Sequence, residues 1–218
     1  MNLEERVAQG KQTRSMFVRA AAQRFARHGY DATSLSDIAA VFGKPKTALR
    51  YHFASKAQLA SAISEYQYDA WARMIESARA AGLEGLVAFF SVLGAAILDG
   101  RREPYAKAII QFRNARPIEP QSMPPRPFEW QKIAVEFVGD AVRLGELPAS
   151  SDPVAVSKLL VDATFGVHQL GEADARENDE LPEYRELWRR LLKGIDATDP
   201  EGTLSRVRVD LATRPREE

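Results

Sequence analysis

Apolar residues along this 218-residue chain recur mostly at every third or fourth position, which is the spacing of one face of an α-helix. Between Lys11 and His28, for example, Phe17, Ala20, Ala21 and Phe25 follow this spacing. Gly29, which comes next, is a typical residue at the end of a helix. No stretch alternates apolar and polar residues convincingly as a strand would. The sequence therefore predicts an all-α fold.

The helical spacing continues through most of the remaining chain. It predicts further helices at residues 34–43, 45–53, 56–81, 83–99, 103–113, 128–144, 153–173 and 181–195. Five prolines between Ala115 and Pro127 predict a loop. Residues 196–218 are polar, and we expect them to form a frayed tail.

The second and third predicted helices are short and closely spaced. Ser34 and Asp37 have the spacing of a capping box at a helix start, and Gly43 ends that helix. Pro45 suits only the first turn of a helix, so the next helix begins there. A helix, a short helix, a tight turn and another short helix form the arrangement that inserts a recognition helix into the major groove of DNA.

The third predicted helix, within the stretch GKPKTALRYHFASK (residues 43–56), has two distinct faces. At about 100° per residue, Leu49 and Phe53 share one face, and Thr47 and Tyr51 point the opposite way. Arg50 flanks the outward face, and an arginine there can make two hydrogen bonds to guanine. The pattern indicates a buried apolar side and a polar contact surface for DNA.

The charge distribution supports a polyanion partner. Residues 1–56 hold ten Lys or Arg and four Asp or Glu, a balance of +6, and the remaining chain carries −6 because the total is zero. Charge alone is equally compatible with an ordinary solvated surface. The basic helices lack the continuous exposed apolar face of a membrane-surface protein, and no apolar run is long enough to span a bilayer.

The composition argues against an enzyme or a metalloprotein. The chain has no Cys, its histidines (His28, His52 and His168) are isolated, and no HExxH, GxSxG or phosphate-loop pattern occurs. We therefore expect no catalytic residue, cofactor or metal. The absence of cysteine and of an apolar leader also favours a cytoplasmic protein.

Residues 14–59 resemble the DNA-binding domain of the tetracycline-repressor (TetR) family of bacterial transcription regulators. The resemblance rests on Phe25, Gly29-Tyr30, Thr33, Ile38-Ala39, Gly43, Leu49, Tyr51-His52-Phe53 and Ser55-Lys56. It implies DNA contacts from Thr33, Lys44, Lys46, Thr47, Arg50, Tyr51, His52 and Lys56. Lys46, Thr47, Arg50 and Tyr51 fall at base-reading positions, and Thr33, His52 and Lys56 at phosphate-contacting positions. The alternative for Tyr51 and His52 is ordinary packing.

Three residues depart from the usual family pattern. Pro45 replaces the common Ser or Thr, Thr47 the common Gly, and Arg50 the common Tyr. An operator sequence therefore cannot be borrowed from relatives.

The DNA-binding stretch together with residues 126–147 resembles the γ-butyrolactone-receptor subgroup, which controls antibiotic production in actinomycetes. The resemblance implies a small apolar ligand and places Trp130 against it, and we add Phe90, Phe112 and Phe165 from the many aromatic residues of the region. Furans, butenolides or antibiotics are alternative ligands, a ligand-insensitive DNA-binding protein is another possibility, and most of these aromatic residues can equally be core.

The family resemblance also implies a homodimer formed by the last two long helices. Their apolar stripes predict interface contacts from Phe165, Val167, Leu170, Leu187, Trp188 and Leu191. The alternative is that the stripes close the core of a single chain. We expect a helix-turn-helix domain at residues 1–55, a ligand-binding and dimerisation domain at 56–195 and a polar tail at 196–218. The overall prediction is a homodimeric repressor that a small molecule releases from operator DNA.

Overall fold

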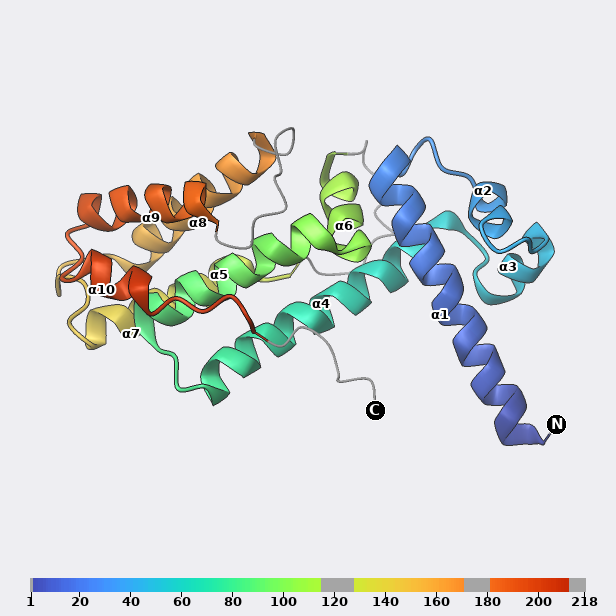
Figure 1. Ribbon diagram of the computed structural model, residues 1–218, viewed down its shortest axis with the longest axis horizontal. Helices are drawn as coiled ribbons and strands as arrows, with labels where there is room; N and C mark the ends of the chain where they lie inside the picture. The colour runs from blue at the N-terminus through green and yellow to red at the C-terminus, as the bar shows by residue number, and fades with distance from the viewer. Residues whose placement is uncertain (1, 115–127, 171–180, 212–218) are drawn as a thin grey trace. The chain divides into compact units, whose positions relative to one another are not determined.

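The computed structural model describes residues 2–114, 128–170 and 181–211, and in these ranges the chain forms ten helices and no strand (Figure 1). The all-α prediction is therefore confirmed. The helices are α1 (Leu3–His28), α2 (Leu35–Ala40), α3 (Lys46–His52), α4 (Lys56–Ala80), α5 (Gly85–Arg102), α6 (Pro104–Asn114), α7 (Trp130–Arg143), α8 (Pro153–Leu170), α9 (Pro182–Gly194) and α10 (Pro200–Ser205).

The chain divides into two compact units. Unit 1 combines residues 1–69 with 100–127, so it contains α1, α2, α3, α6 and the first part of α4. Unit 2 combines residues 70–99 with 128–218 and contains the rest of α4, most of α5 and helices α7 to α10. This division differs from the boundary expected after residue 55, because α6 packs against α1 rather than against the helices that follow it in sequence.

The short helices of unit 1 begin as their sequence predicts. At the start of α2, Ser34 Oγ accepts a hydrogen bond from Asp37 N at 3.2 Å, and Asp37 Oδ2 accepts one from Ser34 N at 2.9 Å. These two bonds are the predicted capping box. Pro45 stands immediately before the first residue of α3, also as predicted. Local signals therefore fix where both helices start.

A compact apolar core holds α1, α2 and α3 together in unit 1. Its large side chains are Phe17, Phe25, Ile38, Leu49 and Phe53, and all of them are buried. Leu49 and Phe53 lie on the inward side of α3, as the helical spacing predicts. Figure 1 shows α2 and α3 side by side next to α1, which is the helix-turn-helix arrangement.

Helix α1 is longer than the sequence pattern predicted. It starts at Leu3 instead of Lys11. The described side chains among residues 5–10 are not buried and form no apolar stripe, so periodicity could not reveal this part of the helix. The start is instead set by Asn2, whose Oδ1 accepts from Glu5 N, and by Glu5, whose Oε2 accepts from Asn2 N, both at 2.8 Å. An asparagine with a glutamate three residues later is a capping box, and it was overlooked.

Helix α4 begins at its predicted cap and is the longest helix after α1. Ser55 Oγ accepts a hydrogen bond from Gln58 N at 3.2 Å. The helix has 25 residues, which corresponds to a length of about 38 Å. It starts in unit 1 and continues into unit 2, so it connects the two units directly.

The core of unit 2 is built around Trp188, which is completely buried (0% exposed). Its ring lies 5.0 Å from that of Phe90 on α5 and 6.1 Å from that of Tyr184 on α9. Its indole Nε1 donates a hydrogen bond to Thr164 Oγ1 at 3.0 Å, and the Thr164 hydroxyl donates in turn to Leu160 O at 2.8 Å. Both buried polar groups are therefore satisfied, which avoids the cost of burying them without a partner.

Residues 196–211 are packed against the rest of unit 2, which differs from the frayed tail expected from residue 196. Asp199 Oδ1 accepts a hydrogen bond from Gly202 N at 2.9 Å and caps α10. The backbone N of Arg208 donates to Ser91 Oγ on α5 at 3.0 Å. Three buried side chains, spaced three and four residues apart, anchor the segment: Leu204, Val207 and Leu211. This spacing was present in the sequence but was masked by the polar residues between them.

Candidate DNA interface and ligand pocket

The outward surface of α3 carries the residues that the sequence predicts to read bases. Lys46, Thr47, Arg50 and Tyr51 are all exposed on this helix. Tyr51 is 87% exposed, although a tyrosine ring normally buries much of its apolar surface. Since Leu49 and Phe53 hold the opposite side, α3 presents a rigid row of cationic and hydroxyl groups to the solvent. Such a row can donate to phosphates and to the edges of bases.

Two further predicted DNA contacts lie at the ends of α3. Lys44 is exposed in the turn before it, where its backbone N donates to Ala39 O at 3.2 Å. His52 is half-buried, and its ring centroid lies 5.8 Å from that of Phe17 and 5.2 Å from that of Tyr51. His52 thus supports the Tyr51 ring on one side and is in contact with the core on the other. It combines the two roles that the sequence left open, packing and a partly accessible polar edge.

Thr33 differs from its predicted role as an exposed phosphate contact. Its side chain is 3% exposed, and its hydroxyl donates to Gly29 O at 2.9 Å. A phosphate only accepts hydrogen bonds, and the single hydroxyl proton of Thr33 is already used. Thr33 therefore ties the end of α1 to the start of α2, and its prediction as a phosphate contact is corrected to a structural role.

Lys56, at the start of α4, is partly engaged inside unit 1. Its Nζ donates to Tyr30 O at 2.7 Å and to Asp31 O at 3.4 Å, and it lies 4.2 Å from the centroid of the Tyr30 ring. Burial lowers the pKa of Lys56, and the nearby Asp31 carboxylate opposes that shift. An ammonium group has three protons, so one is left for a phosphate. Lys56 can contact DNA while it holds α4 to the turn after α1.

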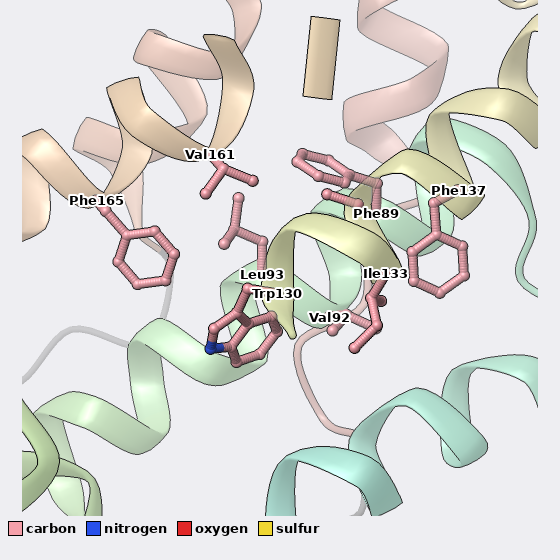
Figure 2. Close-up of a pocket in the computed structure, with 9 residues that line it drawn as sticks. Phe89, Val92, Leu93, Trp130, Ile133, Phe137, Val161 and Phe165 are labelled. Carbon is pink, nitrogen blue, oxygen red and sulfur yellow. The ribbon is translucent and has the colours of Figure 1, made fainter. Parts of the chain in front are cut away.

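Unit 2 contains a pocket lined entirely by apolar side chains. Figure 2 shows the labelled residues converging from three helices, α5, α7 and α8. The atom-free space between them is about 270 Å³ including space open to solvent, but the room left for a water-sized molecule is only about 10 Å³, far below the usual range of about 300–1,000 Å³ for ligand sites. The lining residues are Phe89, Val92, Leu93, Trp130, Ile133, Ala134, Phe137, Val161 and Phe165.

Trp130 and Phe165, which the sequence predicts to contact a ligand, both line this pocket. Trp130 is the first residue of α7 and belongs to an aromatic cluster. Its ring centroid lies 4.8 Å from that of Phe128, 5.0 Å from that of Trp71 and 6.4 Å from that of Phe165. The cluster joins the pocket wall to α4 through Trp71.

The other two predicted ligand residues lie elsewhere, and their assignment is corrected. Phe90 lies about 100° around α5 from Phe89 and packs on Trp188 in the core of unit 2, whereas Phe89 lines the pocket. Phe112 lies in unit 1, with its ring 5.4 Å from that of Phe25 and 5.8 Å from that of Tyr30.

Phe89 and Phe137, which also line the pocket, belong to the aromatic residues that the sequence offered for a cavity, but they were not among the four predicted ligand contacts. The aliphatic lining residues were not singled out, because apolar spacing within α5, α7 and α8 does not tell a pocket wall from a packed core. They could be recognised only once the three helices were placed together.

The structure separates the predicted dimer contacts into accessible and inaccessible ones. Four of the predicted contacts are half-buried: Phe165 and Val167 on α8, and Leu187 and Leu191 on α9. The side chain of Leu170 lies outside the described part of the chain. Trp188 is fully buried in unit 2, so it has no surface to offer a partner, and its assignment is corrected to a core role. Leu159, 48% exposed on α8, belongs to the apolar stripe that the sequence shows on this helix, although it was not among the six predicted contacts.

Among residues 2–114, 128–170 and 181–211, no group of three or more His, Cys, Asp or Glu side chains could hold a metal ion. None of the helices described in these ranges is long and apolar enough to cross a membrane.

Comparison with known families identifies the first part of the chain. Residues 17–63 match the sequence model described as "Bacterial regulatory proteins, tetR family". The region contains the core of α1, all of α2 and α3, and the start of α4. It overlaps most of residues 14–59, whose framework residues resemble that family.

Similarity to known proteins extends over nearly the whole chain. The A-factor receptor protein of Streptomyces griseus is 29% identical over 223 residues, which cover 96% of this chain and 74% of that protein. A solved γ-butyrolactone receptor described as ArpA-like is 28% identical, with a TM-score of 0.76 over 91% of this chain and 96% of that chain. The TetR-family protein CprB of Streptomyces coelicolor, solved with its operator sequence, is 30% identical, with a TM-score of 0.73 over 90% of this chain and 95% of that chain.

Proposed function

This chain belongs to the TetR family of bacterial regulatory proteins, and we propose that it is a transcriptional repressor. We propose that it binds a pseudo-palindromic operator as a homodimer and that a small apolar ligand of γ-butyrolactone type releases it from the DNA. It is a DNA-binding regulator related to the γ-butyrolactone receptors, and not an enzyme. What we propose is the dimer, the class of ligand, and repression that the ligand relieves.

The observation that carries the proposal is the occurrence of two different sites in one chain. An exposed recognition helix with Lys46, Arg50 and Tyr51 lies in unit 1, and an apolar pocket around Trp130 lies in unit 2. A regulator that only organised DNA would have no need for the second site. The combination supports control of DNA binding by a small molecule.

The chemistry of the pocket supports an uncharged, largely apolar ligand. All nine lining residues are apolar or aromatic, so a charged ligand would lose its hydration without gaining a partner. The indole N–H of Trp130 is the polar donor of the lining set and could bind a carbonyl of a lactone. The named relatives, an A-factor receptor and a γ-butyrolactone receptor, support this ligand class. Furans, butenolides and antibiotics remain the alternative ligands.

A homodimer is supported by the accessible faces of α8 and α9. Leu159 on α8 is exposed, and Ala163, Val167, Leu187 and Leu191 are only partly covered by the single chain. A second copy could bury these side chains against their own counterparts, as in a symmetric helical interface. Two recognition helices would then reach half-sites separated by about 34–36 Å, one turn of DNA, or a multiple of it.

The route from ligand to DNA is proposed to run along α4. Trp71 on this helix lies 5.0 Å from Trp130 in the pocket wall, and Lys56 at its start donates to Tyr30 O in unit 1. A ligand that favours one position of Trp130 would shift the population of α4 positions and with it the two recognition helices. The loss of DNA affinity would equal the difference in ligand affinity between the two positions.

The test is DNA binding by fluorescence anisotropy on a fragment from upstream of the protein's own gene, with and without a γ-butyrolactone. We expect tight, salt-dependent binding that the lactone weakens, and a Trp130→Ala variant that still binds DNA but no longer responds. DNA binding that no tested lactone disturbs would favour another ligand or a ligand-insensitive protein. A wild-type protein without any sequence preference would refute the repressor itself.

A further inference from the structure

The first four turns of α1 form an exposed helical extension that none of the roles above uses. We define this extension as residues 3–16; the core of unit 1 begins only at Phe17, and among the extension's described side chains none is buried. At about 1.5 Å per residue it is about 21 Å long. Its start is held by the capping box of Asn2 and Glu5, which sets where the helix begins.

The charged side chains along most of α1 are all positive. Between Arg6 and Tyr30 the chain holds six Lys or Arg residues and no Asp or Glu. Lys11 and Arg14 are both exposed and lie three residues apart, so they are neighbours on one face of the helix. Within the described ranges neither forms an ion pair with a carboxylate. Two neighbouring cations without a counterion disfavour a helix slightly, which a polyanionic partner would reverse.

Arg14 connects the extension to the end of the recognition helix. Its guanidinium carbon lies 4.8 Å from the centroid of the Phe53 ring, and Phe53 caps the C-terminus of α3. One turn further along α1, the Phe17 ring lies 5.8 Å from that of His52 on α3. Arg14 therefore lies next to the end of α3, where Tyr51 and His52 are located, and Lys11 precedes it on the same face of α1. The stack on Phe53 also holds the long Arg14 side chain in place.

We propose that Lys11 and Arg14 extend the DNA interface of α3 onto the sugar-phosphate backbone that flanks each half-site. The charge complementarity and the continuity with α3 both select double-stranded DNA as the partner. The two side chains would contact phosphates and not bases, so they would strengthen binding to any sequence. The inference rests on the proposed DNA-binding function and adds residues that lie before the recognition helix and before the family match, which starts at residue 17.

The experiment compares single and double variants at these positions with a control on the same helix. Lys11→Gln and Arg14→Gln each remove one charge and keep a residue that favours helix formation. Arg27→Gln is the control, because Arg27 is exposed on α1 but lies about 160° around the helix from Lys11 and about 140° from Arg14. Circular dichroism checks that all variants stay helical.

The binding site is first selected from random duplexes with the wild-type protein, and its limits are mapped by hydroxyl-radical footprinting. Affinity is then measured at several salt concentrations on two duplexes, one trimmed to the bases that α3 reads and one with added flanks. We expect each Gln substitution to weaken binding to the flanked duplex several-fold and to lower the salt slope by about 1.8, because the dimer loses one phosphate contact at each of its two half-sites. Binding to the trimmed duplex should stay within the range of the control.

The double variant should also lose backbone protection in the flanks while it keeps protection at the half-sites. The proposal is overturned if Lys11→Gln and Arg14→Gln behave like Arg27→Gln on flanked DNA. It is equally overturned if the loss is the same on both duplexes, since the substitutions would then act through α3, or if light scattering shows that they change the oligomer, since the face would then bind a second copy. A wild-type protein that selects no site would instead refute the repressor.

Discussion

Substitution of Phe112 tests the largest difference between the predicted and the observed position of a site residue. The sequence placed Phe112 in the ligand site, whereas in the structure it packs in unit 1, which contains the recognition helix. Its side chain is 5% exposed and makes T-shaped contacts with the rings of Phe25 and Tyr30, at 5.4 and 5.8 Å. The backbone of Tyr30 also accepts the ammonium group of Lys56 at 2.7 Å. Phe112 on α6 therefore supports the turn between α1 and α2.

The informative substitution is Phe112→Leu, which keeps the site apolar and removes both aromatic contacts. At about 0.5–1.5 kcal/mol for each aromatic pair, the free energy of unfolding should fall by about 1–3 kcal/mol. For a protein of this size that corresponds to a Tm lower by roughly 2–12 °C. DNA affinity should fall as well, because the turn that positions α2 and the start of α4 is loosened.

Thermal unfolding and anisotropy titrations of Phe112→Leu measure both effects, with Phe165→Leu as the matched control. Phe165 lines the pocket in unit 2, so its substitution should alter the response to ligand and leave DNA affinity near that of the wild type. The reasoning is refuted if Phe112→Leu keeps its stability and DNA affinity but loses the ligand response. That result would return Phe112 to the ligand site.

Three further predictions concern the recognition helix, the dimer and the cap of α2. Arg50→Ala should cost about 1–3 kcal/mol in operator binding and relax the preference at one base position, which binding to a panel of single-base operator variants would show. Leu159→Glu should produce monomers in sedimentation velocity, whereas Trp188→Phe should lower the Tm but keep the oligomeric state; the opposite pattern would contradict the core assignment of Trp188. Hydrogen bonds from Ser34 lower the pKa of Asp37 below its usual 3.8, so its stabilising effect is complete above pH 3.8 and is lost as the pH falls through the lowered pKa. Acid titration of Asp37→Ala should therefore show a smaller loss of stability in that range than the wild type.

Local signals in the sequence determined most helices and the faces they present. Apolar spacing, capping residues and proline positions act within a few residues, so they specify α2 and α3 and the exposure of Lys46, Arg50 and Tyr51 without knowledge of the fold. The same signals failed where apolar spacing was absent or sparse. They missed the first turns of α1, which depend on the Asn2 cap, and the short α10.

Only the tertiary structure decided which helices meet and what each buried side chain touches. From the sequence, Phe89 and Phe90 are equivalent, as are Phe112 and Phe165, because apolar spacing shows that a face is covered but not what covers it. Helix packing brings Phe89 and Phe165 to a pocket, Phe90 to Trp188 and Phe112 to α1. The same holds for the polar residue Thr33, whose contact could not be predicted from the sequence. Its hydroxyl donates to Gly29 O, and this hydrogen bond depends on the turn between α1 and α2. Helix formation is governed by neighbours in sequence, whereas the partners of a side chain are set by the packing of helices distant along the chain.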